Sequence, residues 1–81
     1  MTAKTLKMTL EAARRNAGYS QAEAAKKLGV HPQTLAAWEK DSSKLSYVEA
    51  NKLGRLYKVD TDLLFFGPKN EFIRSLRHES D

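Results

Sequence analysis

Gln21 and Gln33 are the side chains best suited to recognise another molecule by hydrogen bonding. They open two short segments of helical pattern, "QAEAAKKL" and "PQTLAAWEK", which only "GVH" separates. A glutamine amide both donates and accepts hydrogen bonds, so at the start of a helix it can contact a polar ligand. Two helices this short bury little apolar surface by themselves, so we expect the pair to be shaped for a partner outside the chain.

The ionisable residues form no pattern that indicates catalysis. The chain has no cysteine and only two histidines. It contains no glycine-rich phosphate loop, no metal-spaced cluster of His, Asp and Glu, and no basis for a Ser-His-Asp triad. We therefore expect a protein that is not an enzyme and that uses neither a metal nor a cofactor.

Helical periodicity runs along the whole chain, and no stretch alternates convincingly with period two. Helix starts are indicated by Thr9, by Pro32 and by two capping boxes that begin at Ser20 and Ser46. We expect an all-α domain over residues 1–67, with five helices over 10–16, 21–28, 32–40, 47–58 and 61–66, the last capped by Asp60. Residues 68–81 are expected to form an amphipathic helical extension.

The segment 32–40 has two different faces. Leu35 and Trp38 are three residues apart and point inward as one helical stripe. The opposite stripe is polar or small and carries Gln33, Ala36, Ala37 and Lys40. A slim, polar helix face of this kind fits a DNA major groove, which is about 12 Å wide.

The charge is unevenly distributed along the 81 residues, whose net charge is +4. Residues 1–58 hold 11 Lys and Arg against 5 Asp and Glu, a net +6, whereas residues 59–81 hold 3 against 5, a net −2. A basic body of this kind is typical of nucleic-acid binding, although a globular domain that is simply basic would have the same balance.

Localisation follows from the same composition. No apolar run approaches the roughly 20 residues of a membrane span, and the N-terminus has no apolar core of a signal peptide. The lack of cysteine fits a reducing compartment. We expect a cytoplasmic protein with no membrane partner.

The stretches "SQAEAAKKLGV", "TLAAWEK" and "RLYKVDTDLLFFG" resemble the Cro and phage-repressor (XRE-type) helix-turn-helix family over about residues 10–67. The spacing of Gln21, Ala25, Gly29, Leu35 and Trp38 is similar to the motif of that family. The resemblance implies a phage-repressor-like fold and a small Cro-like or repressor-like regulator of transcription, of phage or prophage type. It places helix 32–40 in the major groove of double-stranded DNA.

The resemblance also implies individual roles. Gln21 would bind a phosphate at a helix N-terminus, and Gln33 would read a base edge, with adenine as its best partner. Ala37 could touch a thymine methyl group, and His31 most simply caps its helix. The full set of expected DNA-contacting residues is Ser20, Gln21, His31, Pro32, Gln33, Thr34, Ala37, Lys40 and Lys44.

The sequence departs from the family pattern in places. Pro32 stands where many relatives place a base-reading side chain, and Ala36 and Ala37 are short. DNA shape could therefore supply part of the specificity. Asp41 replaces a glycine common after this helix, and aspartate tolerates the left-handed conformation that we expect there.

Relatives pair an arginine with a glutamate at the positions of Arg14 and Glu39. We expect the same pair here, in a structural role that orients helix 32–40.

The C-terminal part carries a surplus of apolar side chains. A short helix over 61–66 cannot bury four consecutive apolar residues in a thin core, and a second stripe follows in the extension. Relatives bind DNA as symmetric pairs, so we expect a homodimer on an inverted-repeat operator. The expected interface is Phe65, Phe66, Phe72, Ile73 and Leu76. The alternative is that the extension folds back and covers the surplus phenylalanine within one chain.

Two further points stay open at this stage. The same fold also serves antitoxins and phage modulators that act mainly by binding a partner protein. Gly54 lies inside the expected fourth helix, where glycine is about 1 kcal/mol less favourable than alanine. Either the helix tolerates it, or another helix approaches closely at this position.

Overall fold

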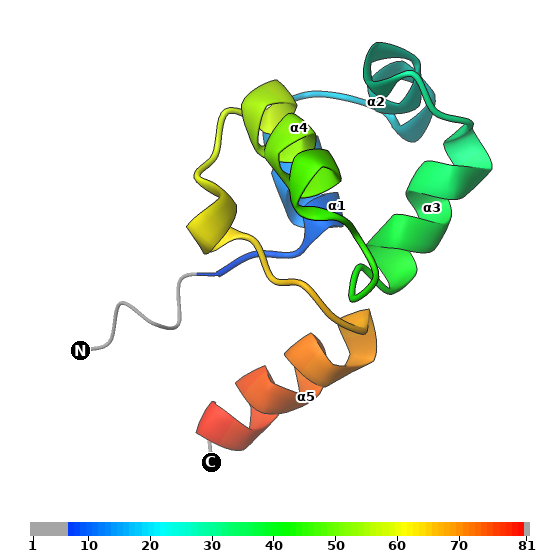
Figure 1. Cartoon of the computed structure of the whole chain (residues 1–81). Helices are drawn as coiled ribbons and strands as arrows, with labels where there is room; N and C mark the ends of the chain where they lie inside the picture. The colour runs from blue at the N-terminus through cyan, green and yellow to red at the C-terminus, as the bar shows by residue number, and fades with distance from the viewer. Residues whose placement is uncertain (1–6, 81) are drawn as a thin grey trace.

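The computed structural model describes the backbone of residues 7–80 and the side chains of residues 7–74. Within this part of the chain the helical segments are α1 (Leu10–Asn16), α2 (Gln21–Leu28), α3 (Pro32–Lys40), α4 (Tyr47–Tyr57), the 3₁₀ turn η2 (Thr61–Leu63) and α5 (Lys69–Ser80). The first four α-helices form one body, and α5 lies to one side of it (Figure 1). The predicted all-α class is confirmed, with α5 as the fifth α-helix.

Side-chain caps determine where the helices begin, as the sequence predicts. Thr9 Oγ1 accepts a hydrogen bond from the backbone N–H of Ala12 at 3.1 Å. Ser20 and Glu23 form a complete capping box, with bonds of 3.1 and 2.9 Å in the two directions. Ser46 forms the same arrangement at the start of α4. Such caps stabilise a helix by about 1 kcal/mol each, because they satisfy N–H groups that have no partner within the helix.

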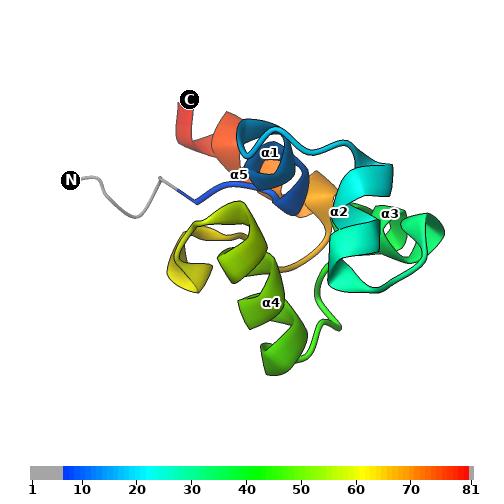
Figure 2. The ribbon, with the colours of Figure 1, turned by 90° about the horizontal axis from the view of Figure 1, so that it is seen from above.

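The core lies where α1 to α4 meet. Its fully buried members come from every one of these helices and from the segment after η2: Leu10, Ala13, Ala24, Ala25, Leu35, Leu53, Tyr57 and Leu64. Figure 2 shows α1 and α4 next to each other, with the α2–α3 pair on the other side of the domain. The two alanines of α2 are small enough to let α2 approach its neighbours closely.

The prediction of a helix over 61–66 is wrong. Only η2 is helical there, and Asp60 makes no side-chain cap. The segment that follows is extended because its backbone pairs with Met8: Met8 N–H donates to Leu63 O, and Phe65 N–H donates to Met8 O, both at 2.8 Å. These bonds occupy groups that a continued helix would need.

Gly54 is buried in α4 because the chain turns back over it. A Cβ atom at this position would lie 2.9 Å from the carbonyl oxygen of Val59. The close approach thus comes from the backbone just after α4 and not from another helix. This backbone is held in place, since Val59 N–H donates to Gly54 O at 3.0 Å.

We expect Gly54→Ala to lower the free energy of unfolding by about 1–3 kcal/mol, because the added methyl group would press on a backbone carbonyl that cannot move away easily. In an open helix position the same change would be stabilising. Urea denaturation measures the difference, with Lys52→Ala on the exposed side of α4 as the control within about 0.5 kcal/mol of the wild type. A Gly54→Ala variant more stable than the wild type would contradict this explanation.

Candidate nucleic-acid interface

The turn between α2 and α3 is built from backbone geometry that the sequence predicts. Gly29 ends α2 in the left-handed conformation, with φ 76°. Val30 N–H then returns to Ala25 O at 3.0 Å. His31 caps α3, its Nδ1 accepting from the N–H of Gln33 at 3.3 Å, and Pro32 occupies the first helical position.

α3 presents its polar stripe outward and its apolar stripe inward. Leu35 and Glu39 are buried, and Trp38 is half-buried against the core. The members of the expected DNA-contacting set that belong to α3 are all exposed, namely Pro32, Gln33, Thr34, Ala37 and Lys40. Ala36 is half-buried, so the exposed face is narrower than the sequence indicates.

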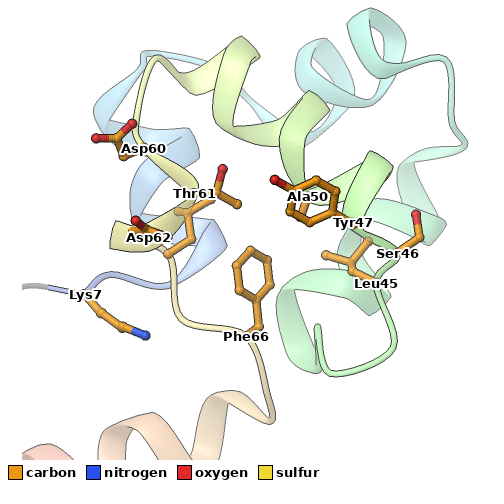
Figure 3. A pocket seen from close by; sticks show the side chains of 10 residues that line it. Lys7, Leu45, Ser46, Tyr47, Ala50, Asp60, Thr61, Asp62 and Phe66 are labelled. Atoms are coloured by element: carbon orange, nitrogen blue, oxygen red, sulfur yellow. The ribbon is translucent and has the colours of Figure 1, made fainter.

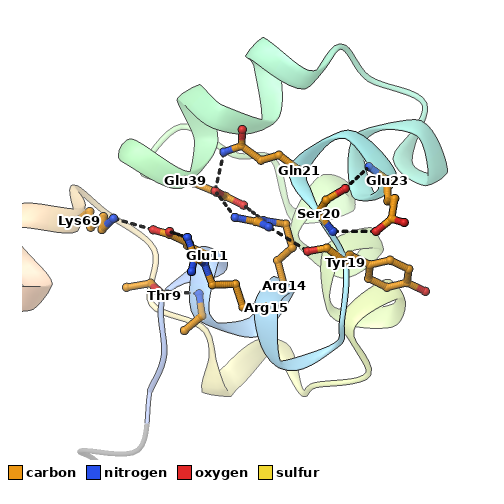
Figure 4. A network of polar contacts seen from close by, with 11 residues as sticks. Thr9, Glu11, Arg14, Arg15, Tyr19, Ser20, Gln21, Glu23, Glu39 and Lys69 are labelled. Atoms are coloured by element: carbon orange, nitrogen blue, oxygen red, sulfur yellow. Dashed lines mark hydrogen bonds and ion pairs between the residues drawn. The ribbon is translucent and has the colours of Figure 1, made fainter.

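A buried ion pair holds α3 against α1. Arg14 Nε donates to Glu39 Oε2 at 2.6 Å, and the two residues are only 6% and 8% exposed. A second guanidinium nitrogen, Nη2, lies 3.4 Å from the other carboxylate oxygen. Figure 4 shows the two side chains meeting between the helices. Because Glu39 lies near the end of α3, this contact fixes how the whole helix is oriented on the body.

Two further groups complete the network around this pair. Arg14 Nη1 donates to the backbone oxygen of Tyr19 at 2.9 Å, which ties down the segment that leads into α2. Gln21 Nε2 donates to Glu39 Oε1, also at 2.9 Å (Figure 4). The amide of Gln21 is therefore engaged inside the protein, a contact that the sequence does not predict.

Burial and hydrogen bonding shift the ionisation of this cluster. The hydrogen bond to Glu39 raises the pKa of Arg14 above its usual value, so the guanidinium stays charged. Burial raises the pKa of Tyr57 to about 12. Its buried hydroxyl group has no hydrogen-bond partner among the described residues, and its ring lies 6.4 Å from that of Tyr19. Tyr57 is thus neutral at physiological pH and is a buried member of the core.

The remaining expected contacts lie at the rim of the α2–α3 unit. Ser20 is exposed, but its hydroxyl oxygen already accepts from Glu23. Lys44 is exposed in the loop that follows α3. Asp41 in the same loop is extended, with φ −153°, so the left-handed conformation expected there is wrong. Its carboxylate accepts from the N–H of Ser43 at 3.0 Å, which shapes the loop without that conformation.

Sequence reasoning did not identify Tyr47 and Val48 as surface residues. They are 79% and 63% exposed in the first turn of α4, close in sequence to Lys44. Helical spacing places Tyr47 on the same stripe as the buried Ala50, so periodicity alone predicts burial. The N-cap Ser46 is the signal for exposure, since it marks the N-terminus of α4, where side chains can extend beyond the core.

Among the side chains that the structure describes, in residues 7–74, no group of three or more His, Cys, Asp or Glu could hold a metal ion. None of the helices within residues 7–80 is both long and apolar enough to cross a membrane.

We expect Arg14→Ala and Glu39→Ala each to lower the free energy of unfolding by about 3–5 kcal/mol, because either change leaves a buried charge without its partner. Arg15→Ala is the matched control. Arg15 is exposed and pairs with Glu11 at 3.0 Å, a surface contact that contributes about 0–1 kcal/mol. Equal melting temperatures for the Arg14 and Arg15 variants would show that the buried pair does not stabilise the fold.

Comparison with known proteins agrees with this geometry. A family model described as "Helix-turn-helix" matches residues 10–64. Over 55 residues the chain is 42% identical to "HTH-type transcriptional regulator ImmR" of Bacillus subtilis (strain 168). That alignment covers 68% of this chain and 43% of the relative, so the chain spans less than half of the relative's length. With the matched region covering α1 to η2, the chain belongs to the XRE-type helix-turn-helix family.

Proposed function

We propose that this protein is a repressor-like transcription regulator that binds double-stranded DNA sequence-specifically and reads the major groove with α3. The observation that carries the proposal is the exposed polar stripe of α3, held in one orientation by the buried Arg14–Glu39 pair. A helix fixed in this way can enter the groove without first being ordered. The entropy cost of ordering α3 is then part of folding and does not weaken binding.

Base reading rests on few side chains. Gln33 is exposed at the start of α3, and a glutamine amide pairs best with the N6 and N7 edge of adenine. Thr34 follows it on the surface, and Ala37 lies one turn after Gln33, where its methyl group suits a thymine methyl. Apart from these three residues, the only long side chain on this stripe of α3 is Lys40. We therefore propose that sequence-dependent DNA shape also helps to distinguish one DNA sequence from another.

Phosphate contacts would come from both sides of α3. Lys40 and Lys44 are exposed at its end and in the following loop, where they can flank the groove. On the other side the N-terminus of α2, with Ser20 and Gln21, carries backbone N–H groups suited to an anion. Since the Gln21 amide donates to Glu39, we propose that Gln21 contributes its backbone N–H and its helix position more than its side-chain N–H.

A homodimer on an inverted repeat is the assembly that we propose. Among the described side chains around η2 and α5, the exposed large apolar ones are Leu63, Phe66 and Ile73, and Ile73 is 43% exposed. Phe65 and Phe72 instead pack on each other within the chain, with ring centroids 4.9 Å apart. This contact within one chain supports the fold-back alternative for these two residues, and we propose that Phe66 and Ile73 contact a second copy. The side chain of Leu76 lies outside the described residues.

A partner-protein role, as in an antitoxin or a modulator, is the second candidate, and one observation favours it. An open hollow of about 850 Å³ lies between the start of α4 and the segment around η2. Figure 3 shows Tyr47 and Phe66 facing it, with the charged side chains of Lys7, Asp60 and Asp62 nearby. Apolar walls with charged groups of both signs suit a protein segment better than a nucleic acid.

The DNA proposal is tested with a site selected from a random duplex pool. We expect Gln33→Ala to weaken binding by about 1–3 kcal/mol and to relax preference at one base position, because one base-edge contact is lost. Lys44→Ala should weaken binding to all DNA sequences alike, because it removes a phosphate contact. It should also reduce the slope of log K against log salt by about 1. Fluorescence anisotropy at several salt concentrations measures both effects.

Arg55→Ala is the control for that experiment, because this exposed cation lies on α4 and not on the α2–α3 unit. Its affinity should match the wild type. If Gln33→Ala keeps both affinity and base preference, α3 is not the reading element. A wild type without affinity for duplex DNA would favour the partner-protein role.

The dimer is tested by sedimentation of the free protein at tens of micromolar. We expect Ile73→Asp to convert the dimer to a folded monomer, since it places a charge in an apolar interface. Asn70→Asp, an exposed change of the same added charge on the same helix, is the matched control. A well-folded wild-type monomer that binds a single asymmetric site would overturn the dimer proposal.

A further inference from the structure

The end of α3 and the start of α5 are joined by a compact backbone contact. Asp41 and Pro68 form an isolated antiparallel bridge, immediately after α3 and immediately before α5. Beside it, Ser42 N–H donates to Gly67 O at 3.2 Å. The end of α3 at Lys40 and the start of α5 at Lys69 are 29 positions apart in the sequence. The two helices are thus linked through the two residues that follow α3 and the two that precede α5.

We call this contact of Asp41 and Ser42 with Gly67 and Pro68 the joint. The side chain of Ser42 completes it. Its Oγ accepts from the N–H of Gly67 at 3.0 Å and lies 3.4 and 3.5 Å from the carbonyl oxygens of Phe65 and Gly67. Ser42 is only 4% exposed, and Gly67 is buried too. A buried N–H group needs a partner, so the hydroxyl of Ser42 fixes where the chain turns toward α5.

The joint leaves no room on the Gly67 side. Gly67 has φ 148°, a conformation that residues with a side chain rarely adopt, and a Cβ there would lie 3.1 Å from the ring of Phe65. That ring in turn packs on Phe72 in the first turns of α5. A second tether is the ion pair between Lys69 Nζ and Glu11 Oε1, at 2.6 Å. All of these contacts hold the beginning of α5, and the helix then runs along one side of the body (Figure 1).

We propose that Ser42 is a positioning residue that sets the angle between α3 and α5 and thereby the spacing of the two DNA half-sites. This inference rests on the proposed function, because it requires that α5 pairs two copies and that α3 reads DNA. In such a pair the distance between the two α3 helices depends on the angle at which α5 leaves each body.

The spacing of the two half-sites is sensitive to the angle between α3 and α5. α5 has 12 residues and is therefore about 18 Å long. A tilt of roughly 10° at the start of α5 moves a part of the molecule about 18 Å away by about 3 Å, close to the rise of one base pair, about 3.4 Å. A loosened joint should therefore blur the preferred spacing by about one base pair, without changing how a single α3 contacts its half-site.

The experiment compares a single half-site with inverted repeats at the best spacing and at one base pair shorter and longer. The wild type should prefer the best spacing by roughly tenfold, within the usual range of coupling between two sites. Ser42→Ala should reduce this preference to about twofold or less and keep half-site affinity within about twofold of the wild type. Ser43→Ala, an exposed serine in the same loop, should behave as the wild type.

Gly67→Ala disturbs the same joint from the other side and should flatten the spacing preference as Ser42→Ala does. It keeps the inference testable if the Ser42 variant does not fold. Two joint variants that lower the melting temperature but keep the spacing preference of the wild type would overturn the inference and leave Ser42 as a folding contact. A wild type that binds every spacing no better than a half-site would overturn the proposed dimer, and the role of Ser42 with it, before any variant is measured.

Discussion

The buried contact between Arg14 and Glu39 is the interaction on which the arrangement of α1, α2 and α3 depends. Two charges with little exposure are stable only when nearly every polar atom finds a partner. The carbonyl of Tyr19 and the amide of Gln21 supply those partners, and both belong to the entry into α2. One network thus orients three helices together, whereas apolar packing alone would permit small rotations of each.

This network also explains why a domain with so small a core can present a rigid reading surface. The buried apolar side chains of α2 are two alanines, and α3 contributes one leucine, Leu35, to the fully buried set. Such small groups allow close helix contact but specify direction weakly. Hydrogen bonds have direction, so they supply the orientation that these side chains cannot.

The sequence predicts well those features, such as the bounds of helices, that depend on residues close together in the chain. Ser20, Gly29 and Pro32 act through their own backbone or the next turn, so the bounds of α2 and α3 follow from local chemistry. The segment 61–66 was mispredicted because its conformation depends on backbone bonds to Met8, far away in the sequence. The Arg14–Glu39 pair could be expected only from resemblance, and the contact of Gln21 was missed, because a side chain that can also bind a phosphate carries no signal of an internal partner.

The bridge between Met8 and Leu64 has a consequence for how the chain folds during synthesis. Each of the helices α1 to α4 can form by local contacts within microseconds, far faster than a ribosome adds residues, at about 5–20 per second. Leu64, however, belongs to the core and pairs with the start of the domain. The core therefore stays open on one side until the segment after η2 has left the ribosome. Until then, nascent chains expose the apolar surface that Leu64 later covers.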